Sequence, residues 1–269
     1  MLYKRLFLSL SIAAVAVGIF TAGAATDTLP GGAINVGSAD YFTVLAKGDA
    51  GFTDNTITGP SFVTGNYGVG GQGKLSITGS SKIDGKLVMH SGGNPTLSGS
   101  ATITGGVTHN DAQLNQALAD AQMLSDAAAM ESVTPAYASL TNVNGSMTIT
   151  GAPGQKVVLS LQDFKLNGGA TFTLQGTATT SFIINVTKSF ALTGNSQIVL
   201  SGVPPQNVLF NILGKGSDVA FTGKAGMSGI LLALNRKVDL SSGHVTGKVI
   251  ANQVVITSGG SVISPTTNQ

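Results

Sequence analysis

The sequence contains no cysteine and no tryptophan, and charged residues make up only 10% of its 269 residues. Without cysteine there are no disulfide bonds, so the folded state depends on buried apolar surface and on backbone hydrogen bonds. The formal net charge is only +2, and no cluster of basic residues stands out. The composition therefore argues against nucleic acid as a partner, because nucleic acids bind basic surfaces.

Residues 1–25 have the three parts of a secretory signal peptide. A basic pair at positions 4 and 5 precedes an apolar run at 6–20, and small residues follow up to Ala25. The run is short for a helix that spans a bilayer. We expect cleavage after residue 24 or 25, no stable membrane span afterwards, and a secreted protein that is extracellular or associated with the cell surface. Cleavage removes two of the 14 basic residues, and the remaining 12 equal the 12 acidic ones.

What the sequence does contain is a repeat of about twenty residues. In each of three copies an apolar residue is followed by Thr or Ser and then by Gly, and a second apolar residue stands six positions later. The first apolar positions are Ile57, Ile77 and Leu97, and the second are Val63, Ile83 and Ile103. Apolar residues alternate with small hydroxyl residues, which indicates strands, and glycines mark the corners between them.

A second set of copies follows at an offset of 26 residues. Residues 166–176 align with 192–202, and residues 182–186 align with 208–212. A third alignment, of 229–233 with 247–251, has an offset of 18 residues. Short strands, glycine corners and a unit near twenty residues are typical of a β-solenoid, in which stacked coils bury one continuous apolar column. About nine coils at about 4.8 Å each would make a body about 40 Å long; the alternative is a β-sandwich with coincidental similarity.

One segment, at about 110–131, breaks the strand pattern. It is rich in alanine, and Asn110 or Asp111 can cap its start. Apolar residues fall on one helical stripe, which consists of Leu114, Ala117, Leu118, Ala121, Leu124 and Ala128. We expect a helix inserted into the solenoid that packs closely against it through this stripe.

Three segments in this order, together with the alanine-rich helix between the second and the third, resemble the ice-binding-protein-like domain, a family of secreted microbial proteins. They are 37–46, 59–69 and, most specifically, 207–262. The resemblance implies an all-β fold, a right-handed discontinuous parallel β-helix with one long α-helix packed alongside. It also implies a single domain over residues 26–269, which we expect to be a monomer.

The resemblance also implies a binding face, because active members of that family bind ice through a flat face with T-A/G-x-T/N motifs on successive coils. The matching positions make up a candidate face of Thr58, Ser61, Thr78, Ser81, Ser98, Thr193, Ser196, Thr222, Ser241 and Thr257. Stacked strands would place these hydroxyls about 4.8 Å apart along the axis, in a grid that can hold an ordered layer of water.

The sequence departs from the family motif in ways that leave a second interpretation open. The last motif position is Ser or Ala, Pro60 interrupts one motif, and Lys82 and Lys224 bring charges near the expected face. Thr or Ser followed by Gly also suits strand ends and corners without any ligand.

The start of the domain, with its F-x-V-L opening at residues 42–45 and its glycine-rich coils, also resembles the choice-of-anchor A domain, found in surface proteins that are often described as collagen-binding-like. This resemblance implies an extracellular adhesion module that recognises a protein or polysaccharide matrix. The partner is then either ice or such a matrix.

Enzymatic activity is not expected. A carbohydrate-active β-helix enzyme, the most distant alternative, needs clustered carboxylates, and the acids here are scattered. His90 and His109 could stack on neighbouring coils, but two histidines alone make a poor metal site. We therefore predict no cofactor and no metal. Asn185 and Asn211 share one register in two apolar runs and are expected to form a stacked internal ladder with a structural role.

Overall fold

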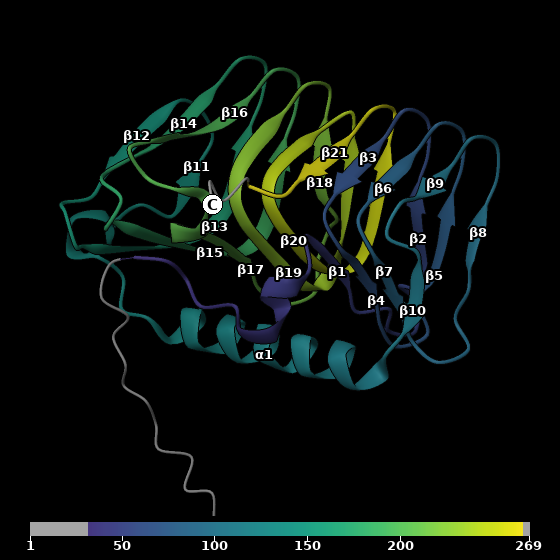
Figure 1. The fold of residues 1–269 in the computed structure, drawn as a ribbon. Helices are drawn as coiled ribbons and strands as arrows, with labels where there is room; N and C mark the ends of the chain where they lie inside the picture. Colours follow the sequence, from purple (N-terminus) through teal and green to yellow (C-terminus); the bar gives the residue numbers. More distant parts are fainter. Residues whose placement is uncertain (1–31, 266–269) are drawn as a thin grey trace, which may run out of the picture.

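The computed structural model describes residues 32–265, which form a three-sided parallel β-solenoid with one long helix along one side (Figure 1). The predicted signal peptide, residues 1–25, lies outside the described residues. Every pairing between named strands is parallel, and each of the three faces of the solenoid consists of nine neighbouring strands or parts of strands. The predicted fold class is confirmed.

The helix face is the side that the long helix covers. Its short strands are β1 (Val44–Ala46), β4 (Tyr67–Val69), β7 (Leu87–Met89), β10 (Val107–His109) and β17 (Val208–Ile212). Four long strands cross this face and bend around its corners into the other faces: β13 (Lys156–Leu166), β15 (Ser181–Leu192), β19 (Gly226–Ser241) and β20 (His244–Thr257). The order across the face is β13, β15, β17, β19, β20, β1, β4, β7, β10.

The second face follows the helix face along each coil. It consists of β2 (Asp54–Ile57), β5 (Lys74–Ile77), β8 (Pro95–Leu97), β11 (Asn142–Val143), β18 (Val219–Thr222) and the carboxyl-terminal parts of the four long strands. Its order is β11, β13, β15, β18, β19, β20, β2, β5, β8.

The third face closes the triangle. It consists of β3 (Phe62–Thr64), β6 (Lys82–Asp84), β9 (Thr102–Ile103), β12 (Met147–Thr150), β14 (Thr171–Gln175), β16 (Gln197–Ser201), β21 (Ser261–Ile263) and the amino-terminal parts of β19 and β20. Its order is β12, β14, β16, β19, β20, β21, β3, β6, β9.

The repeats found in the sequence are the stacked coils, in the predicted register. Ile57 pairs with Ile77, which pairs with Leu97, and Val63 pairs with Ile83. The offset of 26 residues appears as Phe182 beside Val208, and the offset of 18 as Gly229 beside Gly247.

The stacking order is discontinuous in sequence. The first coils run from the middle of the solenoid to one end, at β8, β9 and β10, and α1 (Asp111–Met130) then leads back along the body (Figure 1). The later coils begin at β11 and β12 at the opposite end and run back until β20 and β21 meet β1, β2 and β3. The earliest and the latest coils are therefore direct neighbours.

Three short 3₁₀-helices complete the fold: η1 (Gly37–Tyr41), η2 (Pro135–Tyr137) and η3 (Pro205–Asn207). The apolar column inside the coils contains stacked aromatic rings, among them Phe164 and Phe190 with centroids 5.0 Å apart. A second apolar cluster lies between the helix face and α1, where Leu45, Leu209 and Leu232 meet Leu114 and Ala117.

The helix packs through the predicted stripe, and Asn110 caps its start by accepting a hydrogen bond from the backbone N–H of Gln113 at 3.0 Å. Leu114, Ala117, Ala121 and Ala128 of the stripe are buried. Leu118 and Leu124 are only partly buried against the same cluster.

The asparagine ladder differs in one respect from the expectation. Asn211 donates to the side-chain oxygen of Asn185 at 2.9 Å, so the two do stack across neighbouring coils. The pair lies outside the central column, however, between the helix face and α1. There Asn185 donates to the Ala128 carbonyl, and Asn211 donates to the Ser125 carbonyl and accepts from its hydroxyl. The ladder therefore fastens the helix as well as the coils.

Candidate binding face

Seven of the ten candidate residues form one unbroken line across seven coils. We call this line the hydroxyl row; in order it consists of Ser98, Thr78, Thr58, Thr257, Ser241, Thr222 and Thr193. It runs along the edge where the second face turns into the third. Each of the seven residues is partly or fully exposed and follows an apolar residue, which is buried in every coil except at Leu97, which is 46% exposed. Because strands alternate the direction of their side chains, the row points outward.

The three other candidates do not reach the surface. Ser61, Ser81 and Ser196 are 0% exposed. The hydroxyl of Ser61 donates to the Thr58 carbonyl at 2.6 Å, and that of Ser81 donates to the Thr78 and Gly59 carbonyls at 2.8 Å. These serines hold the corner together from inside and cannot contact an external ligand, which corrects their place in the predicted face.

The glycines of the motif are explained by the corner itself. The residue after each row position has a left-handed backbone, as in Gly79 with φ 72° and Gly223 with φ 71°. Two coils use Ser242 (φ 65°) and Ser258 (φ 56°) at this point. Glycine adopts such a backbone without steric cost, so the corner geometry alone explains the glycines of the motif.

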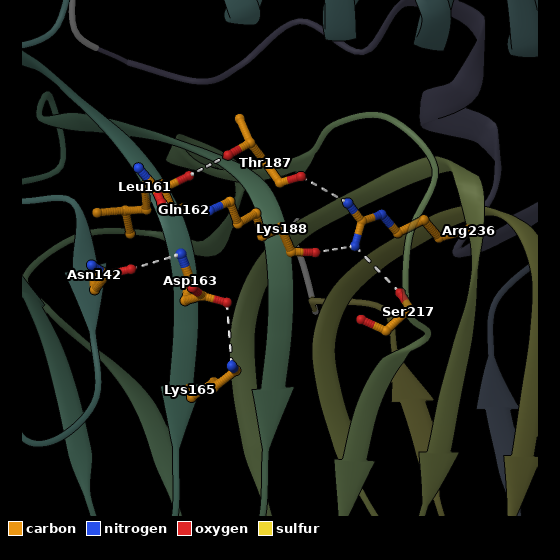
Figure 2. A network of polar contacts seen from close by, with 9 residues as sticks. All are labelled: Asn142, Leu161, Gln162, Asp163, Lys165, Thr187, Lys188, Ser217 and Arg236. Carbon is orange, nitrogen blue, oxygen red and sulfur yellow. Dashed lines mark hydrogen bonds and ion pairs between the residues drawn. The ribbon is translucent and has the colours of Figure 1, made fainter.

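The second face, on one side of the row, carries charges on its strands. Lys237 forms ion pairs with Asp218 at 2.6 Å and Asp239 at 3.6 Å. Lys165 pairs with Asp163 at 3.2 Å, as Figure 2 shows. The hydrogen bond from Lys237 to Asp218 raises the pKa of this lysine. The hydroxyl of Ser189 is the main cause that lowers the pKa of Asp163, followed by Lys165. The second face therefore carries fixed charges at neutral pH.

The two lysines that the sequence placed near the expected binding face lie in different parts of the solenoid. Lys82 is on β6 of the third face, where it pairs with Asp84 at 3.2 Å. Lys224 is exposed in the corner between β18 and β19, directly beside the row.

The other predicted groups take structural roles. The Nε2 atom of His90 lies 3.0 Å from the Gly73 carbonyl, and that of His109 lies 2.6 Å from the Gly93 carbonyl. Within residues 32–265, no three histidine or acidic side chains gather closely enough to hold a metal ion. No helix in the same range is long and apolar enough to cross a membrane.

Arg236 is a polar feature that the sequence pattern did not reveal. The residue is 1% exposed, and its guanidinium donates to five backbone carbonyls, those of Thr187, Lys188, Leu213, Gly214 and Ser217. Three of these contacts are drawn in Figure 2. It joins the corner of one coil to the loop 213–218 of the next and lies away from the hydroxyl row.

Comparison with protein families gives a match to the family described as "Putative Ice-binding-like adhesive domain", over residues 31–263. A comparison with curated proteins finds no match.

Several solved structures have the same fold. The ice-binding protein of the Antarctic ascomycete Antarctomyces psychrotrophicus is 20% identical, with 86% of this chain and 98% of that chain covered and a TM-score of 0.57. A glycosylated ice-binding protein from an Arctic yeast is 18% identical, with 88% and 96% covered and a TM-score of 0.62. An ice-binding protein from an Antarctic biological consortium is 20% identical, with 86% and 90% covered and a TM-score of 0.55. At these identities the likeness shows the fold.

Proposed function

The chain belongs to the ice-binding-like adhesive domain family, and from this premise we propose that it is a secreted, non-enzymatic protein that binds an extended periodic surface, namely ice. The observation that carries the proposal is the hydroxyl row, which continues over seven coils without a gap. No catalytic group is needed for such a function, because the ligand is held and not transformed.

The physical basis of binding is the rigidity of the solenoid. Backbone hydrogen bonds fix the row at steps of about 4.8 Å. Each hydroxyl offers ice one weak contact, but the row presents seven at a fixed spacing without losing further conformational entropy on binding. Water held between the hydroxyls can become part of the ice lattice, so the contact does not require a dry interface.

The rest of the proposal concerns the form of the protein. Residues 1–25 are proposed as a cleaved signal peptide that directs secretion, and residues 26–269 as one domain that acts as a monomer. The solenoid needs no second chain to form the row, because all seven coils come from one chain.

Adhesion to a protein or polysaccharide matrix is the second candidate function. The observation that favours it is the line of ion pairs on the second face around Lys237 and Lys165. Charged side chains of this kind suit a macromolecule with polar groups of its own better than they suit ice.

Thermal hysteresis, the gap between the melting and freezing temperatures of ice in the protein solution, tests the proposed function. We expect a measurable gap for the native protein and about a tenfold smaller gap for a variant with Thr78→Tyr and Thr222→Tyr, because two bulky side chains in the row hold the rest of it away from ice. Thr108→Tyr with Ala119→Tyr, at exposed positions on the helix side, is the matched control and should behave as the native protein. A native protein without any hysteresis would contradict the proposal and favour adhesion.

A further inference from the structure

The third face has a feature that the candidate residues did not include. Seven of its neighbouring strands, from β12 through β14, β16, β19, β20 and β21 to β3, contain no Asp, Glu, Lys or Arg in the parts that form this face. The nearest charged pair on its strands, Lys82 and Asp84, lies one strand further on, in β6. In a chain with acidic and basic residues on most coils, this is a continuous neutral area.

The outward side chains of this area form two columns in register. The middle column consists of Thr148, Thr173, Val199, Ser228, Thr246, Ile263 and Thr64. All seven are partly or fully exposed, and Val199 is 42% exposed. The column beside it, nearer the hydroxyl row, consists of Ser146, Thr171, Gln197, Gly226, His244, Ser261 and Phe62. Gly226 and Ser261 are buried in this column, and the other five residues are partly or fully exposed. The surface of the middle column thus consists of hydroxyl and methyl groups, and neither column contains an Asp, Glu, Lys or Arg.

The second face offers no comparable area. Its strands carry Lys74, Asp54, Lys237, Asp239, Asp163 and Lys165 along almost its whole length. A charged group binds its own hydration shell strongly, and removing or reordering that shell costs free energy. Ice is uncharged, so it cannot compensate this cost with an opposite charge.

We infer that the third face, from β12 to β3, is the sheet surface that contacts ice, with the hydroxyl row as its border. This inference rests on the proposed function. It adds which of the two faces that meet at the hydroxyl row contacts ice. A neutral area of hydroxyl and methyl groups matches the neutral surface of ice. The hydroxyl row borders this area across one corner, which carries the exposed Lys224 between β18 and β19. The residues that determine binding are then Thr173, Val199, Ser228 and Thr246 in the middle column.

Ice adsorption of two matched double variants tests the inference. The first variant carries Thr173→Tyr and Thr246→Tyr on the third face. The second carries Ala191→Tyr and Val255→Tyr, which lie in the middle column of the second face at the same separation of three strands. All four positions point outward, and tyrosine suits strands, so both variants should fold. Far-ultraviolet circular dichroism and the melting temperature confirm folding.

Labelled full-length protein is frozen slowly into ice, and the fraction in the ice is measured. We expect about a tenfold smaller fraction for the third-face variant and no change for the second-face variant. Equal adsorption of the third-face variant and the native protein, or a loss confined to the second-face variant, would overturn the inference while leaving the proposed function intact.

Two further outcomes separate the inference from its premise. If the native protein is excluded from ice, the proposed function fails, and the inference fails with it. A parallel assay with insoluble cellulose and chitin then tests whether the third face binds a neutral polysaccharide. If the native protein binds these polymers and the third-face variant does not, the third face is the binding surface and ice is not its ligand.

Discussion

Replacing Arg236 by methionine is expected to lower the free energy of unfolding by at least about 3 kcal/mol, because five part-buried hydrogen bonds from a charged donor to backbone carbonyls are lost at once. Methionine is similar in length and fills part of the space, so the loss reports mainly on hydrogen bonds. Burial lowers the pKa of the guanidinium, but an arginine stays protonated at any pH at which the protein is studied.

The position of these carbonyls explains why the effect should be large. They belong to the corner at Thr187 and Lys188 and to the loop 213–218, which the guanidinium joins across neighbouring coils (Figure 2). Gly216 lies directly on the guanidinium, where a Cβ atom would come within 2.9 Å of it. Loss of the side chain therefore frees the loop as well as the carbonyls.

Two controls make the Arg236 measurement specific. Arg236→Lys keeps the positive charge but has one nitrogen in place of three, so its loss should be smaller than that of methionine and still clear. Lys237→Met removes the neighbouring residue, whose ion pairs are partly exposed, and should cost less than about 1 kcal/mol. Urea denaturation of the four proteins provides the comparison, and a methionine variant as stable as the native protein would contradict the assigned role.

Replacing Asn211 by leucine should release the second half of α1 and cost about 2–4 kcal/mol, because it leaves buried polar groups of Ser125 and Asn185 without partners. Leucine itself suits the site, since Leu232 occupies the same register on the next coil. The result therefore reflects the lost hydrogen bonds and not poor packing.

Hydrogen exchange identifies where the Asn211 variant opens. The amides of residues 121–130 should exchange faster, while those of β7, under the first half of the helix, should change little. Asn195→Leu, at an exposed corner, serves as the control and should leave both stability and exchange unchanged. Unchanged protection of residues 121–130 in the Asn211 variant would show that the apolar stripe alone holds the helix.

The sequence repeats were sufficient to predict the coils and their register within each set. Each coil places an apolar residue above that of its neighbour, as Ile57 above Ile77, so the spacing of the copies is the spacing of the fold. The meeting of early and late coils, with Ile57 beside Ile256, could not be predicted, since the two sets have different repeat lengths.

The candidate face was predicted only in part, for a physical reason. The sequence motif contains both positions of a corner, and Thr58 and Ser61 look equally polar in sequence. The chain turns between them, so the first points outward and the second bonds to the carbonyl of the first. The sequence did not predict the neutral columns of the third face, because they form only when strands from both ends of the sequence lie side by side.

The role of Arg236 could not be predicted from the sequence either. Its five acceptors come from segments 19 to 49 residues earlier in the chain, and all are backbone groups, which leave no trace in the sequence.

Ice-plane affinity on a single-crystal ice hemisphere is the most direct test of the central claim, that a rigid solenoid surface bordered by the hydroxyl row binds ice. The labelled protein should mark discrete crystal planes, because a periodic surface fits only planes of matching spacing, and the Thr78→Tyr, Thr222→Tyr variant should leave the hemisphere dark. A hemisphere that stays dark with the native protein, under conditions in which it is folded, would contradict the claim.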